Sequence, residues 1–223
     1  MLNKYEIVES CQIPADVLQR LYQDTFGLRE YGTFVEIGAY DGVSFSNTWG
    51  LAHAGWHGLY VDAYQGYIDV CAKNHADHSV EVEACAVGQG NGECDIFLGG
   101  AVSSIIESQA KAWGVPTNNP MRVPMHTMDF LLEKHNWPCR YDLLIVDVEG
   151  AEEDVLRGYS LHRWRPRMAI IETHEGYSSG PYVDANGHNR TVEFCNGYFR
   201  TYRYKKVWHD ILNTVFVSSD KEP

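Results

Sequence analysis

The most constraining feature of this sequence is the segment Thr33–Gly42, in which a short apolar run leads directly into a turn with two glycines and two acids. Glu36, Gly38 and Gly42 have the spacing E-x-G-x-x-x-G. Glycines at such positions let backbone N–H groups approach a ligand closely, because no side chain intervenes. The segment therefore predicts a cofactor site at the end of a strand.

The acidic residues of this turn indicate the charge of the ligand. Glu36 and Asp41 would repel the pyrophosphate of a dinucleotide, which prefers a free helix N-terminus without crowding carboxylates. A ligand that carries a sulfonium and an ammonium group would instead be attracted. We therefore expect S-adenosylmethionine as the cofactor.

Strand-like and helix-like segments alternate after this turn, a pattern typical of an α/β fold with a parallel, Rossmann-like sheet and crossover helices. The run Leu143-Leu144-Ile145-Val146 has the composition of a strand buried on both faces. The pattern assigns no element to residues 101–113, which we interpret as a candidate lid. The predicted strands are residues 33–37, 58–62, 80–86, 93–98, 141–147, 168–171, 198–204 and 213–217, and the predicted helices are residues 15–27, 46–54, 66–74, 127–135 and 151–158.

Length and composition indicate a single domain. The 223 residues are 44% hydrophobic and 22% charged, as in ordinary globular proteins, and no linker-like stretch divides them. We expect one domain over residues 1–223, in which residues 1–30 form a helical cover and residues 33–217 form the core.

Charge and cysteine usage restrict partners and location. The formal net charge of −12 disfavours binding to nucleic acid or to anionic membranes. The six cysteines include no C-x-x-C pair, and Met1–Glu6 begin no apolar run of signal-peptide or membrane-span length. We therefore expect a cytoplasmic protein with no nucleic-acid partner and no membrane insertion. The sequence leaves open whether the chain forms a homo-oligomer.

Acidic residues follow the apolar runs, at the edge where ligands of open α/β sheets bind. Asp62 follows the second run and is placed to accept hydrogen bonds from ribose hydroxyls, with helix capping as its alternative role. Asp147 and Glu149 follow the most hydrophobic run, and Glu172 and His174 follow the next. For the first two the alternative is again helix capping, and for His174 it is a purely structural role.

These motifs, in this order, resemble the FkbM-type methyltransferases, a family of S-adenosylmethionine-dependent enzymes that often act on sugar hydroxyls. The resemblance extends from Phe34 to Val217 and implies a class I methyltransferase fold, with a mostly parallel seven-stranded sheet, an antiparallel C-terminal strand and helices on both faces. The segments that carry it are Val35-Glu36-Ile37-Gly38-Ala39-Tyr40-Asp41-Gly42, Ser46-Asn47-Thr48, Gly55-Trp56-His57-Gly58-Leu59, Ser103-Ser104-Ile105, Thr127-Met128-Asp129, Ile145-Val146-Asp147-Val148-Glu149-Gly150-Ala151-Glu152 and Val155-Leu156-Arg157-Gly158.

The resemblance implies specific cofactor contacts. Members usually carry Glu-Pro after the second strand, whereas this chain has Asp62-Ala63, which shortens the acid but keeps it. The implied contacts are Glu36, Gly38, Ala39, Asp41 and Gly42 in the turn, Ser46 and Asn47 at the methionine end, Asp62 and Ala63 at the ribose, Ala86 and Val87 at the adenine, and Ser104 and Asp147.

We expect O-methylation of a hydroxyl on a sugar or glycan-like small molecule, with Asp147, Glu149, Glu172 and His174 as catalytic residues. Methyl transfer to a hydroxyl needs a base for the proton, which His174 or a carboxylate would supply. We assign no metal; the alternative is a divalent ion such as Mg²⁺ on Asp147, Glu172 and His174.

Two other functional classes fit parts of the pattern. A nicotinamide-dependent oxidoreductase would share the topology, although it needs a dry apolar pocket where this chain has carboxylates. A noncatalytic module that binds glycans or proteins could use Tyr177, Tyr182, Tyr198 and Tyr202 as stacking surfaces. Binding of S-adenosylhomocysteine, the demethylated cofactor, rather than NADH separates the first alternative from methyl transfer.

Overall fold

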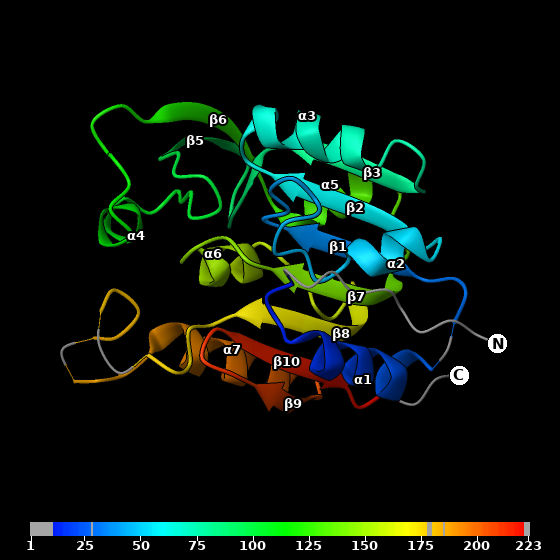
Figure 1. Cartoon of the computed structure of the whole chain (residues 1–223). Helices are drawn as coiled ribbons and strands as arrows, with labels where there is room; N and C mark the ends of the chain where they lie inside the picture. Colours follow the sequence, from blue (N-terminus) through cyan, green and yellow to red (C-terminus); the bar gives the residue numbers. More distant parts are fainter. Residues whose placement is uncertain (1–10, 28, 178–179, 185, 221–223) are drawn as a thin grey trace.

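The central element of the molecule is one seven-stranded sheet, seen in a computed structural model that describes residues 11–27, 29–177, 180–184 and 186–220. Its strands are β1 (Thr33–Ile37), β2 (His57–Asp62), β3 (Val80–Ala84), β7 (Arg140–Val146), β8 (Arg165–Glu172), β9 (Tyr204–His209) and β10 (Asn213–Ser218). They lie in the order β3-β2-β1-β7-β8-β10-β9 (Figure 1). Strands β3, β2, β1, β7 and β8 are parallel, whereas β10 is antiparallel to both of its neighbours. The predicted fold class is confirmed.

Helices cover both faces of this sheet (Figure 1). The helices are α1 (Ala15–Phe26), α2 (Trp49–His53), α3 (Gln65–Asn74), α4 (Glu107–Ala112), α5 (Met128–Lys134), α6 (Glu152–Arg157) and α7 (Arg190–Thr201). Helices α1, α2 and α3 pack into one hydrophobic core, and α5, α6 and α7 pack into another on the opposite face.

The two cores follow from the alternation of side chains along each strand. Phe34 faces the core beneath α1, and its neighbour Val35 faces the core beneath α5. Likewise, Leu143 lies in the first core and Leu144 in the second. A strand with apolar residues at every position must be covered on both sides, which explains why the central strands read as continuous apolar runs.

A small second sheet extends the molecule beyond the carboxyl ends of the main strands. It contains β4 (Ala86–Val87), β5 (Gly92–Ile96) and β6 (Met121–His126), in the order β4-β6-β5 (Figure 1). The predicted strand over residues 80–86 is therefore wrong in extent, because the chain leaves the main sheet after Ala84. Strand β6 was not predicted. Most of its side chains are exposed, so it has no continuous apolar run, and it contains Pro124.

The predicted strand over residues 198–204 is also wrong. Helix α7 runs through most of this region, and the Asn189 side chain caps it by accepting a hydrogen bond from the Val192 N–H at 3.1 Å. Cys195 and Phe199 are buried four residues apart on one side of this helix. The spacing is helical, but aromatic residues at 198, 199 and 202 also suit a strand, so composition alone misled the prediction.

The N-terminal cover is represented by α1, which buries Leu18, Tyr22 and Phe26 against the sheet. Residues 1–10 of the predicted cover lie outside the described residues. Within the residues that the structure describes, no helix is both long enough and apolar enough to cross a membrane.

Candidate active site

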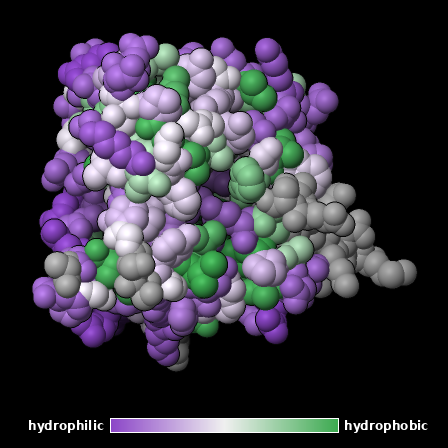
Figure 2. All heavy atoms as spheres, turned by 60° about the vertical axis from the view of Figure 1, so that its left-hand side comes forward, coloured by the Kyte–Doolittle hydropathy of each residue, from purple (hydrophilic) through white to green (hydrophobic). Residues whose placement is uncertain are grey.

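The candidate site lies at the carboxyl ends of β1, β2, β7 and β8. The chain passes from β1 to β2 on one side, and β7 pairs with β1 on the other, so the strand order reverses between β1 and β7. Ligands of open α/β sheets bind at such a reversal. Figure 2 views the molecule with this end turned forward and shows hydrophobic residues interspersed among hydrophilic ones.

A cavity opens at this reversal. Gly38, Asp62 and Asp147 line it together with apolar side chains. The remaining lining residues are Ile37, Tyr40, Val61, Ala63, Cys85, Ala86, Val87, Ile96, Gly100, Ala101, Ser103, Ile105, Val148, Glu149 and Ala151.

The glycine turn is held in place by backbone hydrogen bonds. The N–H groups of Gly38 and Ala39 donate to the carbonyl of Val61 at 2.9 and 3.0 Å. Asp41 does not line the cavity, since its Oδ1 accepts hydrogen bonds from the N–H groups of Val43 and Ser44 at 2.9 and 2.7 Å. Gly42 packs against α3, where a Cβ would lie 2.6 Å from the Cys71 Sγ. Both Asp41 and Gly42 therefore shape the turn from outside the cavity.

Glu36 lies beneath the turn rather than in the cavity. It is 4% exposed, and its carboxylate accepts hydrogen bonds from the hydroxyls of Ser46, at 3.1 Å, and Thr48. Burial raises the pKa of Glu36 to about 7, although these two hydroxyls act in the opposite direction. Asn47 connects the same network to the N-terminal region, because its Oδ1 accepts from the Ile13 N–H at 3.3 Å.

Asp62 occupies the cavity wall at the end of β2. Its Oδ2 accepts a hydrogen bond from the Tyr40 N–H and its Oδ1 accepts one from the Tyr64 N–H, each at 3.0 Å. Burial raises the pKa of this carboxyl to about 6, despite these amide donors. Each oxygen keeps a further lone pair with which to accept a hydroxyl from a ligand.

The opposite wall comes from the small sheet and the segment after it. Ala86, Val87 and Ile105 form an apolar surface that suits a flat aromatic base. Ser104 points away from the cavity, and its Oγ donates a hydrogen bond to the Glu149 carbonyl at 2.8 Å. This bond attaches the segment between β5 and α4 to the loop that follows β7.

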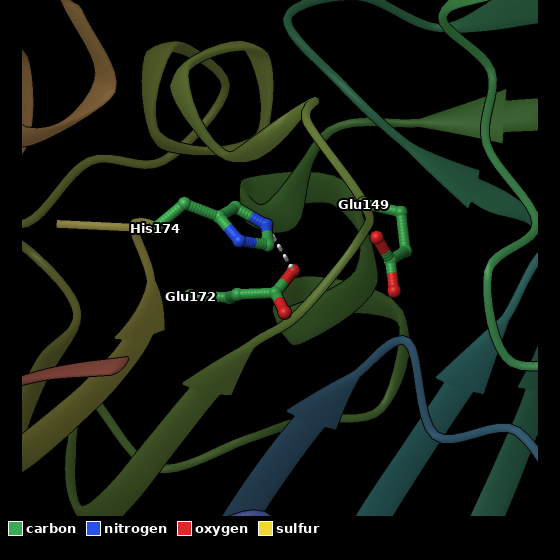
Figure 3. Close-up of side chains that lie close together, drawn as sticks. All are labelled: Glu149, Glu172 and His174. Atoms are coloured by element: carbon green, nitrogen blue, oxygen red, sulfur yellow. Dashed lines mark ion pairs between the residues drawn. The ribbon is translucent and has the colours of Figure 1, made fainter. Parts of the chain in front are cut away.

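Four titratable side chains gather beside this cavity: Asp147, Glu149, Glu172 and His174. Figure 3 shows Glu172 and His174 side by side, with Glu149 on the facing loop. His174 Nε2 lies 3.2 Å from Glu172 Oε2, and both side chains are 2% exposed. Asp147 Oδ2 accepts a hydrogen bond from Gln12 Nε2 at 2.7 Å.

The pKa values of this cluster shift because the groups are buried together. Burial raises the pKa of Glu149 to about 8, and the charges of Asp147 and Glu152 act in the same direction. Burial also raises the pKa of Glu172 well above its usual value. For His174, burial lowers the pKa to about 4, so the imidazole is neutral near pH 7.

Aromatic residues close the cluster from outside. The rings of His174 and Tyr182 stack with centroids 3.5 Å apart, and Trp113 Nε1 donates a hydrogen bond to the Tyr182 hydroxyl at 3.0 Å. Tyr177 meets the His174 ring edge-on at 5.3 Å. Tyr198 and Tyr202 instead pack against the core beneath α7, away from this cluster.

Several contributors were not among the residues expected from the sequence. Gln12 contacts Asp147, which is 135 residues away in the sequence, and no local sequence pattern predicts such a contact. Glu152 fixes the loop after β7, since its Oε1 accepts from the N–H groups of Val148 and Gly150 at 3.2 and 3.0 Å. Trp113 lies in the segment for which the sequence predicted no element.

The fold and this site define a class I methyltransferase: the strand order, the glycine turn and the acids at the strand ends occur together. A model of the methyltransferase FkbM domain matches residues 36–204. The chain belongs to the FkbM methyltransferase family, whose members depend on S-adenosylmethionine.

The chain is similar to several solved structures. A proposed O-methyltransferase from Klebsiella pneumoniae is 15% identical, with 93% of this chain and 82% of that chain covered and a TM-score of 0.50. An O-methyltransferase from Bacillus cereus, solved with SAH, is 14% identical over 97% of this chain and 84% of that chain, with a TM-score of 0.48. No curated protein matches the sequence.

Proposed function

We propose that this protein methylates a hydroxyl oxygen of a small-molecule acceptor, a sugar or a glycan. The observation that supports this most is a group of three acidic side chains and one neutral imidazole, in which Glu172 and His174 are buried, beside a cavity with a glycine turn and an apolar wall. These features suit the two ends of the cofactor and the chemistry of an alcohol acceptor.

The residues of the cavity fit S-adenosylmethionine. Asp62 would accept the ribose hydroxyls, Ala86, Val87 and Ile105 would contact the adenine, and Gly38 would let the methionine end approach the backbone of the turn. The acidic side chains that line the same cavity suit a ligand with positive charge. When bound, the cofactor supplies an electrophilic methyl group on a positively charged sulfur.

The cluster supplies what an alcohol acceptor requires. A hydroxyl is a weak nucleophile near pH 7 and needs a group that takes its proton. Asp147, Glu149, Glu172 and His174 are the groups placed to do so. The aromatic side chains of Trp113, Tyr177 and Tyr182 lie around His174 and offer flat surfaces on which a sugar ring can stack.

Gln12 orients Asp147 in this scheme, because its amide donates to Asp147 Oδ2 at 2.7 Å. The same amide lies 3.5 Å from Glu172 Oε1, so it bridges the ends of β7 and β8. Correct placement of the reacting groups accounts for much of the rate of such transfers.

The proposed compartment is the cytoplasm. All six cysteines have free thiols, which supports a reducing environment. The acidic net charge of −12 agrees with a soluble small molecule or glycan rather than nucleic acid as the acceptor.

The decisive test has two parts. Thermal unfolding is measured with S-adenosylhomocysteine and, separately, with NADH; we expect a higher melting temperature with the first and no change with the second. Purified protein is then incubated with methyl-labelled S-adenosylmethionine and a panel of sugars, glycans and non-hydroxyl acceptors. Label on oxygen supports the proposal, whereas label only on nitrogen or carbon contradicts it. Cofactor binding without transfer to any acceptor would favour a noncatalytic binding module.

A further inference from the structure

We propose that Glu149, Glu172 and His174 form a binding site for a divalent cation of the Mn²⁺ type. One oxygen from each glutamate and one nitrogen from the imidazole all lie within 4.8 Å of one another. The three side chains come from two neighbouring strand ends: Glu149 from the loop after β7, and Glu172 and His174 from the end of β8 (Figure 3). Separate chain segments thus bring three ligand-type atoms to one point.

The donor atoms lack other partners. Glu149 Oε2, Glu172 Oε2 and both ring nitrogens of His174 are buried and have no hydrogen-bond partner among the described residues. The contact of 3.2 Å between His174 Nε2 and Glu172 Oε2 is an ion-pair distance without hydrogen-bond geometry. Buried polar atoms are rarely left unsatisfied, so the two carboxyl oxygens and the unprotonated ring nitrogen are suited to hold a ligand with positive charge.

The charge balance indicates the same kind of ligand. Further acids lie around this point: Gln12 Nε2 contacts both Asp147 and Glu172, at 2.7 and 3.5 Å, and Glu152 Oε1 accepts from the N–H groups on either side of Glu149. Among the described residues, the acidic cluster is contacted by Gln12, His174, Trp113, Tyr182 and backbone amides, and no Lys or Arg forms a hydrogen bond or ion pair with it. A divalent cation would neutralise carboxylates that otherwise repel one another in a buried space.

The donor set favours some metals over others. Mg²⁺ prefers oxygen ligands alone, whereas an imidazole among two carboxylates suits transition ions such as Mn²⁺. This ligand set replaces Asp147, which the sequence suggested as a ligand, by Glu149, because Gln12 already occupies an oxygen of Asp147.

The role of the ion, though not the site itself, rests on the proposed function. A cation beside the cavity would lower the pKa of a coordinated acceptor hydroxyl. Asp147, which is outside the ligand set and adjacent to it, would then be the group that takes the proton.

The test measures metal binding by the protein alone, without cofactor or acceptor. Chelator-treated protein is titrated with MnCl₂ and the free ion is followed by electron paramagnetic resonance. We expect one site per chain, and at least tenfold weaker binding in Glu172→Gln and His174→Asn. Asn is chosen because it tolerates the left-handed backbone of His174, at φ 52°.

A second cluster on the chain provides a matched control. His135 also contacts two glutamates, with Nδ1 2.6 Å from Glu81 and Nε2 3.1 Å from Glu83, but both ring nitrogens are already occupied. His135→Asn should leave Mn²⁺ binding unchanged. If this variant weakens binding as much as His174→Asn does, binding is a surface effect and the inference is wrong.

A spectroscopic measurement keeps the inference testable if the variants unfold. Electron spin echo modulation of the Mn²⁺-loaded native protein should show coupling to an imidazole ¹⁴N. Absence of Mn²⁺ binding, or binding without this coupling, overturns the metal site. Neither result affects the proposed function, which is judged by S-adenosylhomocysteine binding and label transfer measured in the presence of chelator.

Discussion

Gly38 packs directly against the backbone carbonyl of Asp147: a Cβ on Gly38 would lie 1.6 Å from the Asp147 carbonyl oxygen. The cofactor turn after β1 and the acidic loop after β7 are therefore in contact through backbone atoms. The Asp147 N–H also donates to the Ile37 carbonyl at 2.9 Å, which fixes the two strand ends together. Any side chain at position 38 must separate them.

Replacing Gly38 should lower the stability of the protein by more than the backbone strain of a positive φ alone would. Gly38→Ala introduces both a positive φ of 87° and the clash with Asp147, whereas Gly55→Ala has a φ of 90° with nothing within 4 Å of its Cβ. We expect Gly55→Ala to destabilise by about 1 kcal/mol and Gly38→Ala to cost clearly more and to abolish cofactor binding. Urea unfolding and calorimetry with S-adenosylhomocysteine measure the two effects, and equal losses of stability would contradict the packing argument.

Asp62→Ala should weaken the binding of S-adenosylhomocysteine. The variant removes a charged acceptor from the cavity wall and leaves the N–H groups of Tyr40 and Tyr64 without their partner. Hydrogen bonds to charged groups contribute about 1.5–3 kcal/mol, so we expect a roughly tenfold to hundredfold higher Kd. Calorimetry measures the Kd, with Asp69→Ala as the control because Asp69 is exposed on α3 and accepts a hydrogen bond from Gln65 Nε2 at 2.8 Å. Unchanged affinity in Asp62→Ala would remove this residue from the site.

Glu36 should make the protein less stable as pH rises. Its pKa is about 7 in the folded state and near the ordinary value of 4.5 in the unfolded state. The folded state therefore holds more protons between these values, and stability falls as pH increases through this window. Glu36→Gln cannot lose a proton, so its stability relative to the native protein should rise from pH 5 to pH 8, by at most about 1.4 kcal/mol per pH unit.

Urea unfolding at several pH values tests this expectation. Other buried acids and His174 are common to both proteins, so the difference between them isolates Glu36. Glu107→Gln serves as control, because Glu107 is exposed and pairs with Lys111 at 2.6 Å. A difference that stays constant with pH would show that Glu36 does not titrate as its burial implies.

Asp147→Asn should reduce methyl transfer strongly and affect cofactor binding little. The substitution preserves shape but removes the charge, and Gln12 can rotate its amide to keep the hydrogen bond. We expect kcat to fall by about two orders of magnitude or more, the range typical for loss of a proton acceptor. The kcat is measured with labelled cofactor, and the Kd of S-adenosylhomocysteine by calorimetry. Near-normal turnover would exclude Asp147 from the chemistry.

Trp113→Phe should loosen the cover over the acidic cluster. The variant keeps an aromatic ring but removes the hydrogen bond of 3.0 Å to the Tyr182 hydroxyl. A net contribution of about 0.5–1.5 kcal/mol predicts roughly twofold to tenfold faster hydrogen exchange in α4. Mass spectrometry measures the exchange, and Trp208→Phe in β9 is the control. Exchange in α4 as slow as in the native protein would mean that this bond does not hold the cover closed.

The sequence alone determined the parallel strands of the main sheet and the edge of the sheet at which the candidate site lies. Short continuous apolar runs such as Leu143–Val146 are typical of strands covered on both faces, and in a parallel sheet the acids that follow such strands lie at one edge. The order of the motifs also identified the family. Each motif is a short run of adjacent residues that meets a local requirement of the backbone, so it can be recognised without knowing the fold. The helix α7 was missed because Tyr198, Phe199 and Tyr202 suit a strand as well as a helix, and only packing against the core selects between them.

Only the tertiary structure decided which acids face the cavity and which lie beneath it. Glu36 and Asp62 were both expected to contact the cofactor, yet Glu36 points to Ser46 and Thr48 whereas Asp62 lines the cavity. The contact of Gln12 with Asp147, the stack of Tyr182 on His174 and the approach of Glu149 to Glu172 join segments far apart in the chain. Such contacts depend on how whole elements pack, because the direction of a side chain at the end of a strand is set by its neighbours in space.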